Sequence, residues 1–116
     1  MKILNYKDVL PIVMDNENVK QVAGRVMIGK GDGAQNFCMR VFEMGPGGFT
    51  PRHAHGWEHE VFVHKGKGEV WIKDQWYPLK KGSAVFVPAD VEHQFRNTFD
   101  KVFTFVCLIP SGAPEI

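Results

Sequence analysis

The sequence predicts an all-β protein, a single domain folded as a jelly-roll barrel (a double-stranded β-helix), on three observations. Twelve glycines and seven prolines divide the 116 residues into short runs. Those runs alternate in polarity or are rich in β-branched and aromatic residues, as sheet strands are. A hydrophobic content of 44% with 12% aromatic residues is enough to build one core in a chain of ordinary domain size. We therefore expect one domain over residues 1–116, with little helix.

The runs between turn signals place the expected strands. They cover residues 21–28, 36–44, 60–65, 68–72, 75–79, 83–87, 94–97 and 102–109. Glycine, proline, asparagine and aspartate mark turns at residues 29–33, 45–48, 66–68, 73–74 and 88–90. Many short strands at this spacing are typical of a sandwich or a barrel, here of the jelly-roll type.

The first 20 residues are expected to pack on the barrel or on a second subunit. The first 15 of them carry six aliphatic residues, too many for a loose tail: Ile3, Leu4, Val9, Leu10, Ile12 and Val13. A barrel this small also exposes sheet faces and edges that a partner strand would cover. A homodimer is therefore expected.

Net charge, hydrophobic segments and cysteine content limit the classes of partner and the cell compartment that the sequence suggests. A formal net charge of +1, with no basic run or acidic tail, argues against nucleic acid and anionic membranes and favours a small-molecule ligand. No stretch is long and apolar enough for a signal peptide or a membrane span, so a soluble, cytoplasmic protein is expected. Cys38 and Cys107 lack CxxC spacing and are expected to be reduced thiols.

Four of the five histidines suggest a metal site. His53 and His55 are two residues apart and would share one face of an extended segment. His59 has the same parity, whereas His93 must come from another part of the fold. Imidazole nitrogens suit zinc, copper, iron, nickel and manganese, and three or four on one ion form an ordinary protein site.

The surroundings of these histidines follow two spacings. The first reads Gly47, five residues, His53-x-His55, three residues, His59, six residues, Gly66, and the second reads Gly82, five residues, Pro88-Ala89-Asp90, two residues, His93, three residues, Asn97. Both resemble the two motifs of the cupin superfamily. Asp90 stands where the motif has glycine, and His59 stands where the family usually has a glutamate ligand. Glu60 is the alternative ligand if the segment slips by one residue.

The segment RHAHGWEHEVFVHKG resembles a subgroup of small single-domain bacterial cupins with an all-histidine site, often occupied by manganese. This resemblance implies His53, His55, His59 and His93 as ligands and a structural role for Glu60. It implies one divalent transition metal per chain, manganese first, otherwise iron, copper, nickel or zinc. His64 lies at an odd offset from His59 and is expected on the surface.

The expected pocket follows from strand parity and from the same resemblance. Phe105 and Cys107 share one face of the last strand and are expected to look toward the metal. The resemblance implies that Arg40 is near the cavity, and Trp57 is expected at its mouth, in the loop between His55 and His59. Alternative roles are a plain core aromatic for Phe105, a small buried residue for Cys107 and a core or subunit contact for Trp57.

Three functions are compatible with a four-imidazole site that keeps open coordination positions. The leading expectation is a metal-dependent oxidoreductase, dioxygenase-like, that uses dioxygen or peroxide on a small organic substrate. The second is redox-neutral Lewis-acid chemistry, such as isomerisation, cyclisation or lyase action, as other cupins perform. The third is a non-catalytic binding module, since the same barrel hosts many functions.

Overall fold

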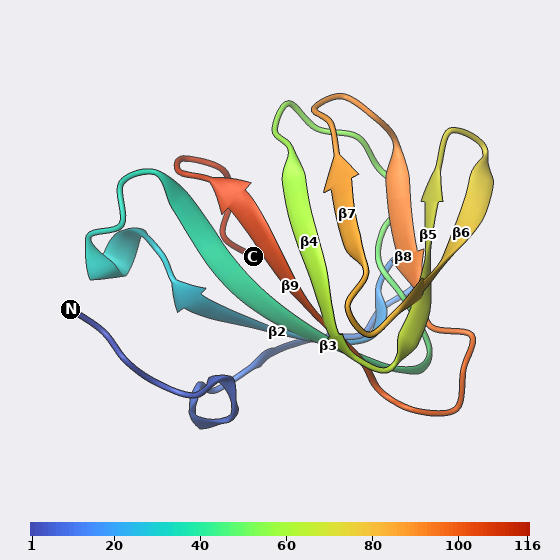
Figure 1. Cartoon of the computed structure of the whole chain (residues 1–116), viewed down its shortest axis with the longest axis horizontal. Helices are drawn as coiled ribbons and strands as arrows, with labels where there is room; N and C mark the ends of the chain where they lie inside the picture. Colours follow the sequence, from blue (N-terminus) through green and yellow to red (C-terminus); the bar gives the residue numbers. More distant parts are fainter.

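The computed structural model describes all residues 1–116, and they form one curled antiparallel sheet with almost no helix (Figure 1). The strands are β1 (Ile12–Met14), β2 (Lys20–Ile28), β3 (Phe37–Phe49), β4 (His59–Lys65), β5 (Lys67–Ile72), β6 (Gln75–Lys80), β7 (Ala84–Val87), β8 (His93–Arg96) and β9 (Phe103–Pro110). Two short 3-10 turns, Tyr6–Asp8 and Lys30–Asp32, complete the secondary structure. The all-β expectation is confirmed.

The strand order is β6-β5-β8-β3-β9-β4-β7, with β2 on β3 and β1 on β2. The long strand β3 joins the two halves of the sheet. Its first part pairs with β9, and its last residue, Phe49, pairs with Arg96 of β8. The sheet therefore curls into a half-barrel, and Figure 1 shows it running from β2 and β3 at one end to β5 and β6 at the other. The concave face holds the core.

The expected turn at residues 45–48 is wrong, because these residues lie within β3. Lys20 pairs with Phe49 and Val22 with Met44, so four residues of β3 oppose a single residue of β2. Such an excess is a bulge, which bends a strand without ending it. Gly48 is required there, because a Cβ atom would lie 2.6 Å from Cγ of Met44 and 2.8 Å from the carbonyl oxygen of Lys20.

The other strands agree with the expected ranges to within one or two residues, apart from β1, which was not expected. β1 pairs with β2 through Ile12 and Gly24. A three-residue run has too little periodicity to be recognised as a strand. Within the barrel, thirteen buried residues form one hydrophobic cluster, which includes Phe103 and Met44, both fully buried.

The N-terminal segment crosses the outside of the sheet. The ring of Tyr6 lies edge-on to His64, 5.8 Å between centroids, and the Arg25 side chain donates to the carbonyl of Val9 at 2.8 Å. Ile3 and Leu10, in contrast, are 86% and 92% exposed. None of the helical segments reaches the length and apolar character that crossing a membrane requires.

Candidate metal centre

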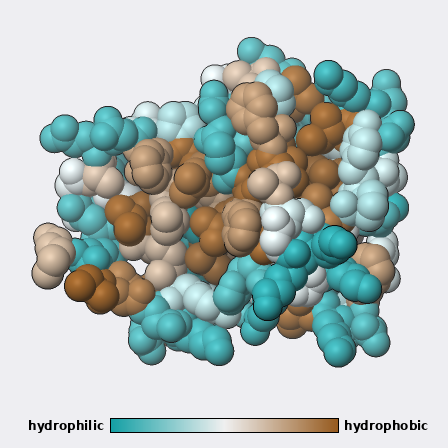
Figure 2. Space-filling view, in the orientation of Figure 1, coloured by the Kyte–Doolittle hydropathy of each residue, from teal (hydrophilic) through white to brown (hydrophobic).

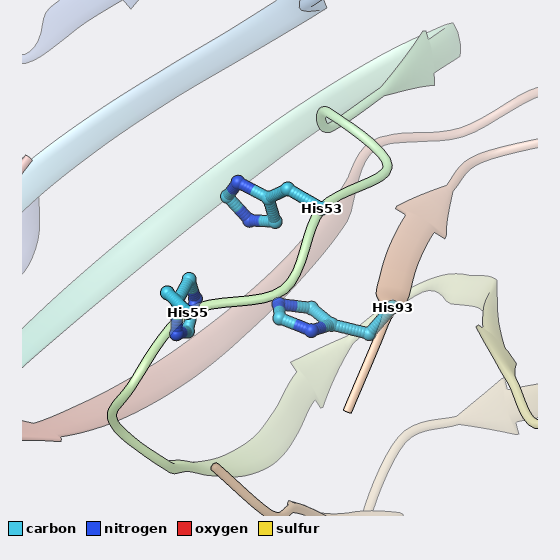
Figure 3. Close-up of side chains that lie close together, drawn as sticks. All are labelled: His53, His55 and His93. Atoms are coloured by element: carbon cyan, nitrogen blue, oxygen red, sulfur yellow. The ribbon is translucent and has the colours of Figure 1, made fainter. Parts of the chain in front are cut away.

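The structure brings the rings of His53, His55, His59 and His93 together in the mouth of the half-barrel. The first two come from the loop between β3 and β4, and His93 begins β8 (Figure 3). Backbone bonds fix this crossing, because His53 N donates to His93 O at 3.1 Å and His93 N to His53 O at 2.9 Å. Ligand atoms of His53, His55 and His93 all lie within 4.8 Å of one another. His59 completes the group, since its Nε2 is 2.9 Å from Nε2 of His55.

Backbone carbonyl groups orient two of the four rings, those of His55 and His93. Nδ1 of His55 lies 2.9 Å from the carbonyl oxygen of Trp57, and Nδ1 of His93 lies 2.9 Å from that of Val91. A carbonyl oxygen only accepts hydrogen bonds, so both Nδ1 atoms must carry the proton and donate. The lone pair of each ring then lies on Nε2. This is the tautomer and the outer hydrogen bond that metal-ligating histidines need.

His59 differs in what lies behind its ring. Its Nδ1 is 3.2 Å from Sγ of Cys107 and 3.5 Å from Nη2 of Arg40. If Nε2 of His59 binds an ion, Nδ1 carries the proton and Cys107 is its acceptor. Cys107 therefore lies behind the ring of His59, in the cavity lining where it was expected.

Burial favours the neutral form of three of the four rings, those of His53, His59 and His93. Burial, reinforced by His93 and Arg40, lowers the pKa of His59 to about 3. Desolvation likewise lowers the pKa of His53 and His93. A charged imidazolium cannot bind a metal, so these shifts keep the donors available over the physiological range.

These residues fit a divalent transition metal. Four neutral imidazoles are donors that manganese, iron, nickel, copper and zinc all accept. Nitrogens at right angles on an ion with bonds of about 2.1 Å would be about 3.0 Å apart. The 2.9 Å between Nε2 of His55 and Nε2 of His59 is close to that value. With four such ligands, a six-coordinate ion would keep two positions for solvent or substrate.

A cavity of about 290 Å³ opens beside the four histidines. Its other lining residues are mostly apolar: Met14, Val19, Val22, Arg40, Phe42, Thr50, Pro51, Trp57, Phe95, Phe105, Cys107, Pro114 and Ile116. Phe105 stacks between Phe42 and Phe95, at centroid distances of 5.6 and 5.1 Å. Trp57 stacks on the ring of His55 at 4.1 Å. A flat, largely apolar molecule would fit against these aromatic walls.

All four expected pocket residues, Arg40, Trp57, Phe105 and Cys107, line this cavity. Glu60 does not, because strand alternation turns it to the opposite face from His59, where it pairs with Leu108 and Phe86. There, burial and Glu58 raise the pKa of Glu60 to about 7. His64 is exposed on the outer surface, as expected.

The two ends of the chain supply walls that were not expected. Met14 and Val19 come from β1 and the loop after it, whereas Pro114 and Ile116 come from the C-terminal tail, which folds back over the mouth. A hydrogen bond helps to hold the tail, since Nη1 of Arg40 donates to the backbone carbonyl oxygen of Glu115 at 3.3 Å. Neither segment has a periodic pattern that would mark it as a cavity wall in the sequence.

The fold and the two motifs define a cupin, and the chain belongs to that family. The family model of the cupin domain matches residues 40–109, from the start of the pocket on β3 to the end of β9. This range contains all four histidines that converge in the mouth of the half-barrel.

The chain is similar to proteins with named activities. The structure of the polyketide cyclase RemF from Streptomyces resistomycificus superposes with a TM-score of 0.91 at 29% identity, covering 98% of this chain and 82% of that one. The polyketide synthase CurC of Streptomyces cyaneus is 31% identical over 72% of this chain and 54% of its own length. A glucose-6-phosphate isomerase of Thermococcus onnurineus is 31% identical over 71% of this chain and 50% of its own. The chain thus spans about half the length of these two curated relatives.

Proposed function

We propose that this protein is a redox-neutral, metal-dependent cyclase that acts on an aromatic or polyketone substrate. The observation that carries the proposal is the aromatic wall of Phe42, Phe95 and Phe105 beside four converging imidazoles. Similarity to the polyketide cyclase RemF over nearly the whole chain supports it. Ring closure between two carbonyl-bearing positions transfers no electrons to an acceptor, so it needs no oxidant.

His53, His55, His59 and His93 are the proposed ligands of one divalent transition metal, with manganese the first candidate. When bound, the ion supplies Lewis acidity that polarises a substrate carbonyl. The chain contributes the rest. The carbonyls of Trp57 and Val91 hold two rings in place. The phenylalanine wall keeps water from a flat substrate and holds its reacting carbons near each other, which is where positioning contributes to rate.

Two other functions have weaker support. The oxidoreductase that the sequence suggested first has no counterpart in the named activities of RemF, CurC or the isomerase. Isomerisation of a sugar phosphate, suggested by the Thermococcus relative, is also redox-neutral. The walls here are mostly apolar, with Arg40 the one permanently charged side chain, which suits a sugar phosphate less well than a polyketone.

The test separates redox-neutral from oxygen-dependent chemistry. Protein loaded with zinc, which has no redox chemistry, is mixed under strictly anaerobic conditions with aromatic polyketones and, in parallel, with glucose 6-phosphate. We expect cyclised polyketone of unchanged oxidation state, detected by mass spectrometry as loss of water only. Turnover that requires dioxygen and a redox-active metal would contradict the proposal, and turnover of the sugar phosphate alone would favour the isomerase.

We also propose a homodimer that uses the outer face of β3, β9, β4 and β7. Phe37, Phe62 and Phe86 on this face are 50%, 52% and 59% exposed. Phe62 pairs with Val106 and Ala84 on its two neighbours, so the apolar side chains lie in adjacent rows that point away from the cavity. Figure 2 shows hydrophobic side chains gathered over the region where β3, β9 and β4 lie. Self-complementary apolar faces of this kind suit a two-fold partner.

Phe62→Glu is expected to convert the dimer to a monomer, because it places a charge in the middle of that face. Light scattering after gel filtration at micromolar concentration measures the change. Tyr77→Glu is the matched control, since Tyr77 is 42% exposed but lies on β6, at the far end of the sheet. A monomeric wild-type protein, or a Phe62→Glu variant that stays dimeric, would contradict this assignment.

A further inference from the structure

Arg40 carries a buried positive charge without a counter-ion. The residue is 7% exposed, and none of the four ion pairs of the structure includes it. Its hydrogen bonds go to neutral groups: Nη1 donates to Glu115 O at 3.3 Å and Nη2 to Sγ of Cys107 at 3.0 Å. Its Nε has no partner at all. Burying an uncompensated charge is costly, which suggests that a partner is missing.

The cavity beside Arg40 has the charge pattern of an anion site. Its 17 lining residues include no aspartate or glutamate. Its polar members besides Arg40 and Cys107 are Thr50 and the four histidines, so no acidic side chain of the cavity lining faces the guanidinium. A divalent ion on the imidazoles would add to this positive charge, and the mostly apolar walls would strengthen the attraction for an anion.

Arg40 lies close to the proposed metal centre, so an anion bound to Arg40 would lie near that centre as well. Nη2 lies 3.5 Å from Nδ1 of His59, so one imidazole ring separates the guanidinium from the proposed ion. The guanidinium carbon also lies 4.9 Å from the centre of the Phe42 ring, at the edge of the aromatic wall. A flat molecule on that wall could place an acidic oxygen on Arg40 and a second oxygen near the histidines.

We propose that Arg40 is a substrate-binding residue that holds an anionic oxygen, a carboxylate or acidic enol, of an aromatic or polyketone substrate. This inference rests on the proposed function in that it names the substrate class of the same cavity. A planar guanidinium with free donors suits such an oxygen, and a charge-assisted hydrogen bond in a water-poor site is strong. The anion would thereby fix which way round the substrate lies.

The test measures binding and not turnover. Calorimetry compares 2-naphthoate with its uncharged methyl ester, on wild-type protein stripped of metal and on zinc-loaded protein. We expect wild type to bind the acid about 10- to 100-fold more tightly than the ester in both forms, the range that one hydrogen-bonded charge supplies. Arg40→Met should abolish this preference while still binding the ester. Arg40→Lys, which keeps the charge, should retain part of it.

Arg52→Met is the matched control, because Arg52 lies outside this cavity with its guanidinium 3.9 Å above the ring of Trp71. It should leave the preference unchanged. Equal binding of acid and ester by metal-free wild type would overturn the proposal, as would a preference that exists only with zinc, which would assign the anion to the ion. An Arg40→Met protein that melts earlier but keeps the preference would make Arg40 a clamp for the C-terminal tail.

The binding experiment gives an answer even if Arg40→Met does not fold or the protein is not a cyclase. If Arg40→Met does not fold, as judged by circular dichroism, the metal-free wild type and Arg40→Lys still decide. Absence of the preference for the acid in the wild type overturns the proposal. A preference in the wild type that Arg40→Lys keeps in part supports it. The outcome is also separate from that of the proposed function. A protein that binds naphthoate through Arg40 but cyclises nothing would refute the cyclase and leave the anion site standing.

Discussion

His59→Ala is expected to weaken metal retention roughly 10- to 100-fold or more, because loss of even an outer hydrogen-bond partner of a ligand costs that much. Nε2 of His59 lies 2.9 Å from Nε2 of His55 and the residue is only 8% exposed, so the substitution removes one of four converging donors and puts no other donor in its place. Competition of zinc or manganese against a chelating dye, followed by element analysis of the dialysed protein, measures the loss.

Glu60→Ala is the matched control on the same strand. Its carboxylate faces outward between Leu108 and Phe86, so metal retention should stay within about twofold of wild type. Should Glu60→Ala lose metal while His59→Ala keeps it, the ligand register proposed for this chain would be wrong.

Asn97→Ala is expected to cost about 2 to 4 kcal/mol of unfolding free energy, because several buried polar groups lose their partners at once. The residue is 1% exposed. Its Nδ2 donates to Met44 O at 2.9 Å and to Lys101 O at 2.8 Å, and its Oδ1 accepts from Phe99 N at 2.9 Å. One side chain thus connects β3 to the loop between β8 and β9.

Urea denaturation followed by tryptophan fluorescence measures this cost. Asn36→Ala is the control, because Asn36 is exposed and its side chain makes no hydrogen bond. It should change stability by less than about 0.5 kcal/mol. Equal stabilities for Asn97→Ala and wild type would mean that water satisfies the freed groups and that Asn97 does not stabilise this connection.

The sequence was informative where spacing and alternation act locally. The intervals from Gly47 to Gly66 and from Gly82 to Asn97 predicted which histidines would meet, and the alternation of β4 separates His59 from Glu60. The expected pocket residue Phe105 likewise followed from parity on β9. Period-two patterns carry this information because a strand has only two faces.

What the sequence could not provide depends on contacts between distant segments. The glycine-rich residues 45–48 read as a turn, and only pairing with β2 makes them a bulge within β3. The cavity walls at Met14 and Ile116 come from segments without periodicity, so nothing local indicates where they fold. The unpaired charge of Arg40 was equally hidden, because the absence of a partner is a property of the folded chain.

The carbonyls that aim His55 and His93 lie only two residues from the rings they hold, at Trp57 and Val91. Each ring and the carbonyl that accepts its hydrogen bond therefore belong to the same short segment and would move together. A shift of β8 against the loop between β3 and β4 would change the distance between His55 and His93 but leave each ring paired with its own carbonyl. Wall side chains that do not touch these two rings can accordingly be exchanged for others without turning the imidazoles away from a common point, so that part of the wall and the orientation of the ligands can vary independently.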